Sequence, residues 1–181
     1  NVAHALPAAD GMISLAAMDA VAETAGANGI RLIPLLELFR GLGKSVLTEN
    51  NEILTGFYLP QRQTGQASAF SRIMRPQGVA LPILNMAVWL QRSGERIECA
   101  RIAVGPAGPT PQRARQVEEF LGGKTYSEDT TAEAVKLIRE TMKFRTSPRR
   151  ATAEYRTHLV GVLLLEVLEK AWLRAGTMEV L

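Results

Sequence analysis

The feature that most constrains the fold is a pair of β-rich segments joined by a short turn. "LNMAVWLQ" (84–91) and "RIECARIAV" (96–104) are rich in β-branched and apolar residues, and "SGE" (93–95) between them is typical of a tight turn. Because successive strand residues point to opposite faces, we expect one buried face that carries Ile97, Cys99, Arg101 and Ala103. The two segments therefore predict a hairpin with one buried face.

Three segments after the hairpin have helical patterns and complete the chain. We predict helices over Pro111–Leu121, Thr131–Met142 and about Thr152–Ala175. Pro111 suits a first helical turn, and Gly122-Gly123 suits the end of that helix. With "SAFSRIM" (68–74) as a further strand, strands precede helices and do not alternate with them. This order predicts an α+β fold, with an antiparallel sheet of about three strands packed against about three helices.

A polar segment, "LPQRQTGQ" (59–66), separates this region from a different N-terminal pattern. We therefore predict one unit over residues 1–60 and a second over residues 66–175. In the first unit we expect a short helix in "GMISLAAMDA" that Asp10 can cap. We also expect strands at 20–25, 29–35 and 53–59, and a loop through "RGLGKSVLTENNE" (40–52).

Composition excludes several classes of protein. The chain is 46% apolar and 22% charged, which is typical of a folded domain, and its net charge of +3 is scattered, which argues against nucleic-acid binding. The most apolar run, Leu159–Leu168, is too short to cross a bilayer, and no basic and apolar leader precedes it, so we expect no membrane association. The single cysteine, Cys99, favours a reducing compartment, and we expect a cytoplasmic protein.

The residues with catalytic potential are few. His4 and His158 are far apart, no group of residues has metal-ligand spacing, and the residues around Lys44 do not match a phosphate-binding P-loop. Arg150, Glu154 and His158 recur at helical spacing and predict ion pairs along one face of the last helix. On these residues alone, the chain is a binding or scaffold unit without a reaction centre of its own.

Several separated stretches nevertheless resemble one family. "NVAHALPAAD", "IRLIPLLELFRGLGKSVLTENNEILTGFYLP", "SAFSRIMR", "ARIAVGPAGPTPQRAR" and "RRATAEYRTHLVGVLLLEVLEKA" are similar, in this order, to segments of the FAD-binding medium subunits of molybdenum hydroxylases, the carbon monoxide dehydrogenase and xanthine dehydrogenase group. The resemblance covers the chain from Asn1 to about Trp172. It implies the end of a PCMH-type FAD-binding domain, followed by a domain like the C-terminal domain of the CO dehydrogenase flavoprotein.

The resemblance also implies four residues that contact FAD. Asn1 and Asp10 match the asparagine and aspartate of the family's FAD-binding segment, although Leu6 stands where family members often have serine. Leu54 would lie against the isoalloxazine ring, and Arg72 occupies the place of a lysine beside it. Alternatives remain for each role: Asp10 as a helix cap, Leu54 as a core residue and Arg72 as a surface ion-pair partner.

The function that the resemblance implies is electron transfer. Electrons would pass from molybdopterin in a large subunit, through [2Fe-2S] clusters in a small subunit, to FAD and then to an acceptor. The family's Gly-rich pyrophosphate loop is not found in this sequence, so we expect the chain to be the distal part of such a subunit, without bound FAD and inactive on its own. The alternative is a flavin-free scaffold that docks the molybdopterin and iron-sulfur subunits.

Overall fold

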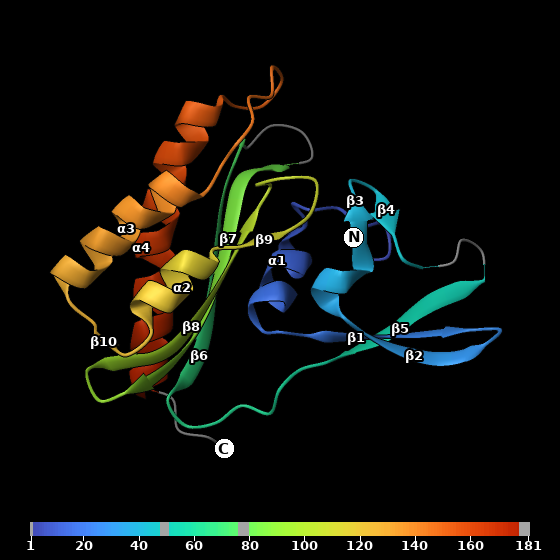
Figure 1. The fold of residues 1–181 in the computed structure, drawn as a ribbon, viewed down its shortest axis with the longest axis horizontal. Coiled ribbons are helices and arrows are strands. Elements are labelled where there is room, and N and C mark those ends of the chain that lie inside the picture. The colour runs from blue at the N-terminus through green and yellow to red at the C-terminus, as the bar shows by residue number, and fades with distance from the viewer. Residues whose placement is uncertain (1, 48–50, 76–79, 178–181) are drawn as a thin grey trace.

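The computed structural model describes residues 2–47, 51–75 and 80–177. The N-terminal part contains α1 (Asp10–Ala17), the short helix η1 (Leu35–Leu38) and five strands (Figure 1). Strands β1 (Val21–Gly26), β2 (Gly29–Pro34) and β5 (Glu52–Tyr58) form an antiparallel sheet in the order β2-β1-β5. Strands β3 (Phe39–Gly41) and β4 (Lys44–Ser45) form a small hairpin beside it.

The C-terminal part is a larger antiparallel sheet covered by helices. Its order is β10-β8-β7-β6, with β9 paired to β8. The strands are β6 (Gln66–Met74), β7 (Pro82–Ser93), β8 (Arg96–Gly105), β9 (Gln112–Arg113) and β10 (Lys124–Thr125). Helices α2 (Arg115–Leu121), α3 (Glu128–Thr141) and α4 (Ala153–Thr177) lie together on one side of this sheet (Figure 1).

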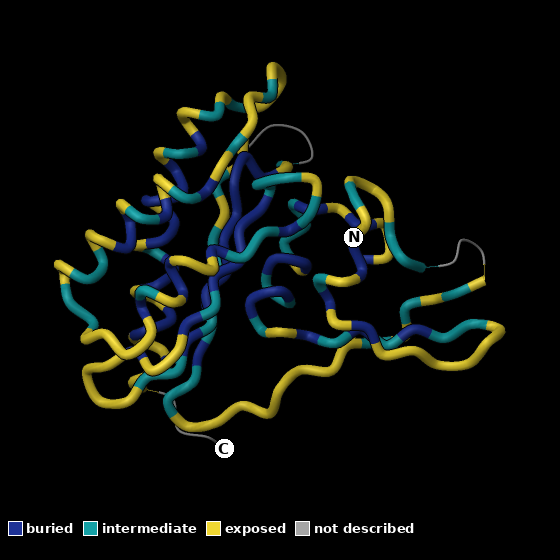
Figure 2. Tube along the Cα trace, viewed as in Figure 1, coloured by how far each residue is buried: buried dark blue, intermediate teal, exposed yellow. Residues whose placement is uncertain are grey.

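The main core lies between this sheet and these helices. Met86, Val88 and Leu90 alternate along β7 and meet Leu163 and Leu164 of α4, and all five side chains are almost completely buried. The dark tube segments of β7, β8 and α4 follow this interface (Figure 2). Burial of a large aliphatic side chain contributes about 1.5–3 kcal/mol, so this layer supplies most of the stability of the C-terminal part.

The opposite face of the same sheet carries small residues and receives α1. Ala87 of β7 pairs directly with Ala103 of β8, and both belong to a second core cluster with Met12, Ile13 and Ala16 of α1. Because alanine side chains are short, the helix can approach the strands closely. The two parts of the chain therefore share a core, and the larger sheet is covered on both faces.

The predicted α+β class is confirmed, and the strands and helices agree in outline. The larger sheet has five strands and not about three, and the predicted loop 40–52 contains part of the β3–β4 hairpin. Two further expectations are corrected. Pro111 does not begin a helix, because β9 intervenes and α2 starts only at Arg115. Cys99 is exposed and does not share a buried face with Ile97, because the register between β7 and β8 shifts between Gln91 and Arg92. Such a bulge adds a residue to one strand and reverses the alternation beyond it.

A group of charged side chains, of which Arg113 and Glu118 are nearly buried, fixes the C-terminal end of α1. The Arg113 Nε donates to Glu118 Oε1 at 2.5 Å, and Arg113 Nη1 donates to Asp19 Oδ1 at 2.7 Å. Burial alone would lower the pKa of Arg113, but Glu118 and Asp19 outweigh burial and raise it. Asp19 also accepts from Arg101, whose guanidinium lies 3.7 Å above the Trp89 ring centroid. These contacts tie the end of α1 to β8, β9 and α2.

Gly65, at the start of β6, provides a test of the strand packing. It has φ +77°, and a Cβ there would collide with the Arg92 carbonyl oxygen. Gly94 has φ +56°, and a Cβ there would meet only open space, so Gly94→Ala is the matched control. In both variants, backbone strain should lower the free energy of unfolding by about 1 kcal/mol. In Gly65→Ala, overpacking should lower it by about 1–3 kcal/mol more. Equal unfolding midpoints in urea would contradict this packing.

Candidate functional site

Asp10 and Arg72, which are 62 residues apart in sequence, form an ion pair at the upper end of α1. Arg72 Nη1 donates to Asp10 Oδ2 in a short contact. Asn85 Nδ2 donates to Asp10 Oδ1 at 2.9 Å and to the Ala8 carbonyl oxygen at 2.9 Å. The carboxylate is thus held by a cation on β6 and an amide on β7. Both members of the ion pair remain about one third exposed, so solvent can reach them.

The register of the sheet explains this arrangement. Arg72 of β6 is directly opposite Asn85 of β7, and Asn85 is opposite Gly105 of β8. All three residues therefore lie in one row on the face that α1 covers. Gly105 permits the close approach, because a Cβ there would collide with the Pro7 carbonyl oxygen and the Ile13 side chain.

Asp10 and Arg72 line a cavity of about 810 Å³. Its apolar wall consists of leucine, alanine and proline side chains. They come from two segments, Leu6–Ala9 and Ala80–Pro82, and from Pro106 and Pro109. Its size lies within the range of cofactor and ligand sites. The Arg72 guanidinium uses one of its N–H groups for Asp10, and within the described ranges no other hydrogen bond of this group is found. Its further donors are open to a ligand in the cavity.

Asp10 does not have the alternative role of a helix cap. The N-cap of α1 is Ala9, which makes no side-chain cap hydrogen bond, and Asp10 is the first helical residue. Its side chain bonds to Arg72 and Asn85 instead. The alternative role of Arg72 as an ion-pair partner agrees with the structure. Its partner is Asp10, which is itself a candidate site residue.

The remaining two candidates are Leu54 and Asn1. Leu54 lies on β5 opposite Thr24 of β1, is partly buried and packs against the core cluster that contains α1. It is absent from the cavity lining, so in this structure it is a core-packing residue. Asn1 lies outside the described residues.

Sequence patterns did not reveal three arginines that line the same cavity. Arg145 and Arg150 lie between α3 and α4, and Arg156 lies in the first turns of α4. Arg150 precedes α4, so it does not continue the predicted helical row with Glu154 and His158. Arg156 is only 3% exposed. The local sequence "AEYRTH" does not distinguish Arg156 from a solvent-exposed arginine on an amphipathic helix. Its burial becomes evident only in the folded structure.

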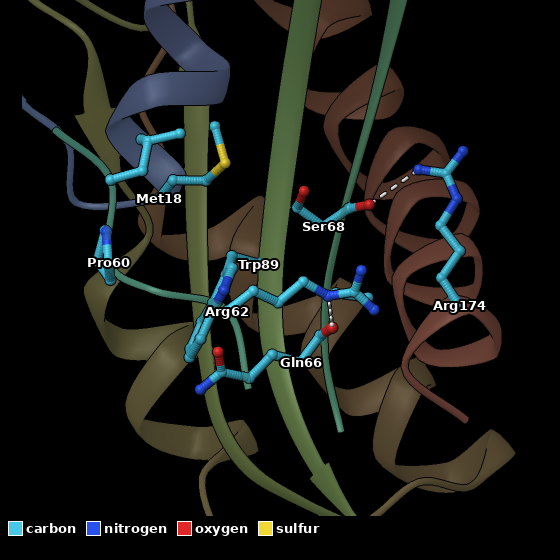
Figure 3. A pocket seen from close by; sticks show the side chains of 9 residues that line it. Met18, Pro60, Arg62, Gln66, Ser68, Trp89 and Arg174 are labelled. Carbon is cyan, nitrogen blue, oxygen red and sulfur yellow. Dashed lines mark hydrogen bonds between the residues drawn. The ribbon is translucent and has the colours of Figure 1, made fainter. Parts of the chain in front are cut away.

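A second cavity, of about 380 Å³, lies between the 59–65 segment, β6, β7 and the end of α4 (Figure 3). Both of its arginines already have backbone partners: Arg62 Nε donates to the Gln66 carbonyl oxygen at 3.1 Å, and Arg174 Nη1 donates to that of Ser68 at 2.8 Å. These bonds anchor the 59–65 segment and the last turns of α4 to β6. This cavity is therefore explained by packing.

Two further kinds of site are not found in the part of the chain that the structure describes. No group of three or more His, Cys, Asp or Glu residues there could hold a metal ion. No helix there is long and apolar enough to cross a membrane.

Comparison with known proteins now decides the family. Residues 68–171 match the family described as the CO dehydrogenase flavoprotein C-terminal domain, and residues 1–62 match the FAD binding domain in molybdopterin dehydrogenase. The chain belongs to the family of FAD-binding medium subunits of molybdenum hydroxylases. Asp10 lies within the matched FAD-binding segment, and Arg72 lies within the matched C-terminal segment.

Relatives in this family are similar over nearly the whole chain. The carbon monoxide dehydrogenase medium chain of Afipia carboxidovorans is 29% identical over 175 residues, which cover 97% of this chain and 60% of that protein. The nicotine 6-hydroxylase medium subunit of Paenarthrobacter nicotinovorans is 30% identical, with 96% and 60% covered. The carbon monoxide dehydrogenase structure from Hydrogenophaga pseudoflava matches with a TM-score of 0.86 at 27% identity, and 95% and 59% are covered. The chain spans about 60% of the length of these relatives.

Asn85 offers a test of how the Asp10 carboxylate is held. Asn85→Ala removes both N–H donors from partly buried acceptors, and we expect a loss of about 2–3 kcal/mol in the free energy of unfolding, since one bond is charge-assisted. Gln91→Ala, also on β7, loses one exposed, neutral hydrogen bond to the Thr64 carbonyl oxygen. It should cost about 1 kcal/mol or less and serves as the control. Equal losses in denaturant titrations would show that Asn85 does not hold the carboxylate.

Proposed function

We propose that this chain is the flavin-ring side of an electron-transfer subunit, in which FAD accepts electrons from [2Fe-2S] clusters and passes them to an acceptor. The observation that carries the proposal is the Asp10–Arg72 pair in a cavity of about 810 Å³. The family supports the FAD assignment, and the pair supplies polar groups of both signs at one place. FAD, when bound, supplies the redox chemistry.

The residues of the cavity fit the ring end of a flavin. The wall of prolines, alanines and leucines offers apolar surface to a planar heterocycle, and Arg72 retains N–H donors that can reach ring carbonyl oxygens. A permanent positive charge beside the ring favours its anionic reduced form. Asp10 would orient Arg72 and can accept a hydrogen bond from the ring. Leu54 and Asn1 are further flavin contacts in this proposal, on the strength of the family resemblance.

The remaining parts of the proposal follow from the family. We infer a molybdopterin-binding large subunit and a [2Fe-2S] small subunit as partners, and a cytoplasmic complex, which agrees with the free thiol of Cys99. Without a Gly-rich pyrophosphate loop, the 181-residue chain alone should bind FAD only weakly.

One observation favours the alternative of a scaffold that docks other subunits. Ile30, Leu32 and Ile53 share one face of the β2-β1-β5 sheet, and each is at least 60% exposed. An apolar sheet face of this kind is typical of a surface that another protein segment covers. A flavin-free complex that assembles normally would support this alternative.

The FAD role of Asp10 can be tested in the complete subunit, from which FAD is removed before the titration. Asp10→Ala should weaken FAD binding by about 1.5–3 kcal/mol, a factor of ten or more in Kd, because a charge-assisted bond and the orientation of Arg72 are lost. Asp19→Ala is the matched control, since Asp19 also pairs with arginines beside α1 but lines neither cavity described above. Fluorescence titration with FAD gives both affinities. Equal Kd values for the two variants would remove Asp10 from the flavin site.

The role of Arg72 can be tested by potentiometry on the same subunit. Arg72→Met should lower the two-electron flavin potential by about 10–30 mV, since the loss of one partly solvated cation is worth about 0.5–1.5 kcal/mol. Arg101→Met removes a second sheet arginine that pairs with an aspartate near α1, and it should leave the potential unchanged. An unshifted potential in Arg72→Met would place the guanidinium away from the ring.

A further inference from the structure

Arg156 is a buried cation for which the described part of the chain provides no carboxylate. The residue is 3% exposed, and its Nη1 donates to the Pro106 carbonyl oxygen at 3.3 Å. Its Nε is buried without a hydrogen-bond partner among the described residues. A buried charge of this kind costs several kcal/mol unless an opposite charge compensates it. Arg113, whose side chain is only 4% exposed, has both Glu118 and Asp19 as such partners.

The neighbours of Arg156 increase this excess of positive charge. Burial lowers the pKa of Arg156, and the charges of Arg150 and Arg145 lower it further. Neither Arg145 nor Arg150 forms a salt bridge with any residue in the described ranges. Arg75 Nη2 donates to the Arg150 carbonyl oxygen, which brings a further cation to the same segment.

All three arginines line the cavity of about 810 Å³, together with Ser147. Among the described residues of this lining, Asp10 is the single carboxylate, and Arg72 and Asn85 already bind it. The cavity therefore has a surplus of positive charge and of unused N–H donors. An anion that enters it would remove the repulsion between the arginines and satisfy the buried one.

We propose that Arg145, Arg150 and Arg156 form a binding site for a phosphate group. Guanidinium groups match phosphate oxygens with paired N–H donors, and a dianion compensates more of this charge than a carboxylate does. A free phosphate ion and a phosphate ester such as a nucleotide offer the same phosphate chemistry to these arginines. The cavity, of about 810 Å³, has room for either. The site does not depend on the proposed flavin role of Asp10.

Calorimetric titration of the 181-residue protein tests the site directly. Inorganic phosphate and ADP are titrated separately at constant ionic strength, set with chloride. Arg150→Met should weaken binding about tenfold, because one charge-assisted contact is lost. Arg149→Met, which removes an exposed neighbouring arginine outside the cavity lining, should change the affinity less than twofold. Tighter binding of ADP than of phosphate would identify a nucleotide as the source of the phosphate group, and equal affinities would identify the free ion.

Thermal unfolding of Arg156→Met provides an independent measurement. Replacement of an uncompensated buried charge by an apolar side chain is often neutral or stabilising. We therefore expect a Tm equal to or above that of the parent in phosphate-free buffer, and no increase on addition of phosphate. The parent and Arg149→Met should show an increase in Tm with phosphate. A lower Tm for Arg156→Met, with an unchanged response to phosphate, would make Arg156 a structural residue and overturn the proposal.

Phosphate binding by the Asp10→Ala variant distinguishes this site from the proposed flavin site. The variant should bind phosphate at least as tightly as the parent, since a carboxylate is removed from the cavity. If FAD binding to the complete subunit fails to respond to Asp10→Ala while phosphate binding still requires Arg150, the phosphate site stands and the flavin role falls. Phosphate binding that is absent, or equal in Arg149→Met and Arg150→Met, overturns the phosphate site.

Discussion

The structure depends on the docking of α1 against the small-residue face of the larger sheet. Ala87 and Ala103 are paired on adjacent strands, and their short side chains allow Met12, Ile13 and Ala16 to pack closely over them. A larger residue at either position would separate the helix from the strands, because close-packed interiors tolerate little added volume. This contact joins the two parts of the chain into one core.

The charged residues at both ends of α1 follow from that contact. Asp10 meets Arg72, and Asp19 meets Arg101, in two rows of the same sheet face. The pairs differ in their surroundings. Arg101 packs over Trp89, and Asp19 also binds the buried Arg113, so that end is a structural anchor. The Asp10–Arg72 end opens into the large cavity, and the same ion-pair chemistry there can also serve a ligand.

Much of the fold could be predicted from local patterns. The tight turn after Ser93, the alternation in β6 and β7 and the long apolar run of α4 each reflect interactions between residues close in sequence. The exposure of Cys99 could not be predicted in this way, because a bulge depends on how β8 pairs with β7. The start of α2 at Arg115 likewise depends on β9, whose two residues become a strand only by pairing with β8.

The sequence by itself determined the family and the α+β class, because local patterning and motif order survive without coordinates. It also predicted four flavin contacts, Asn1, Asp10, Leu54 and Arg72, which stay predictions. Only the tertiary structure decided that Asp10 and Arg72 touch, that Leu54 lies apart from them, and that Arg156 is buried without a carboxylate among the described residues. Those facts depend on strand register and on the docking of α1. Both are contacts between residues that are distant in sequence, which local patterns do not encode.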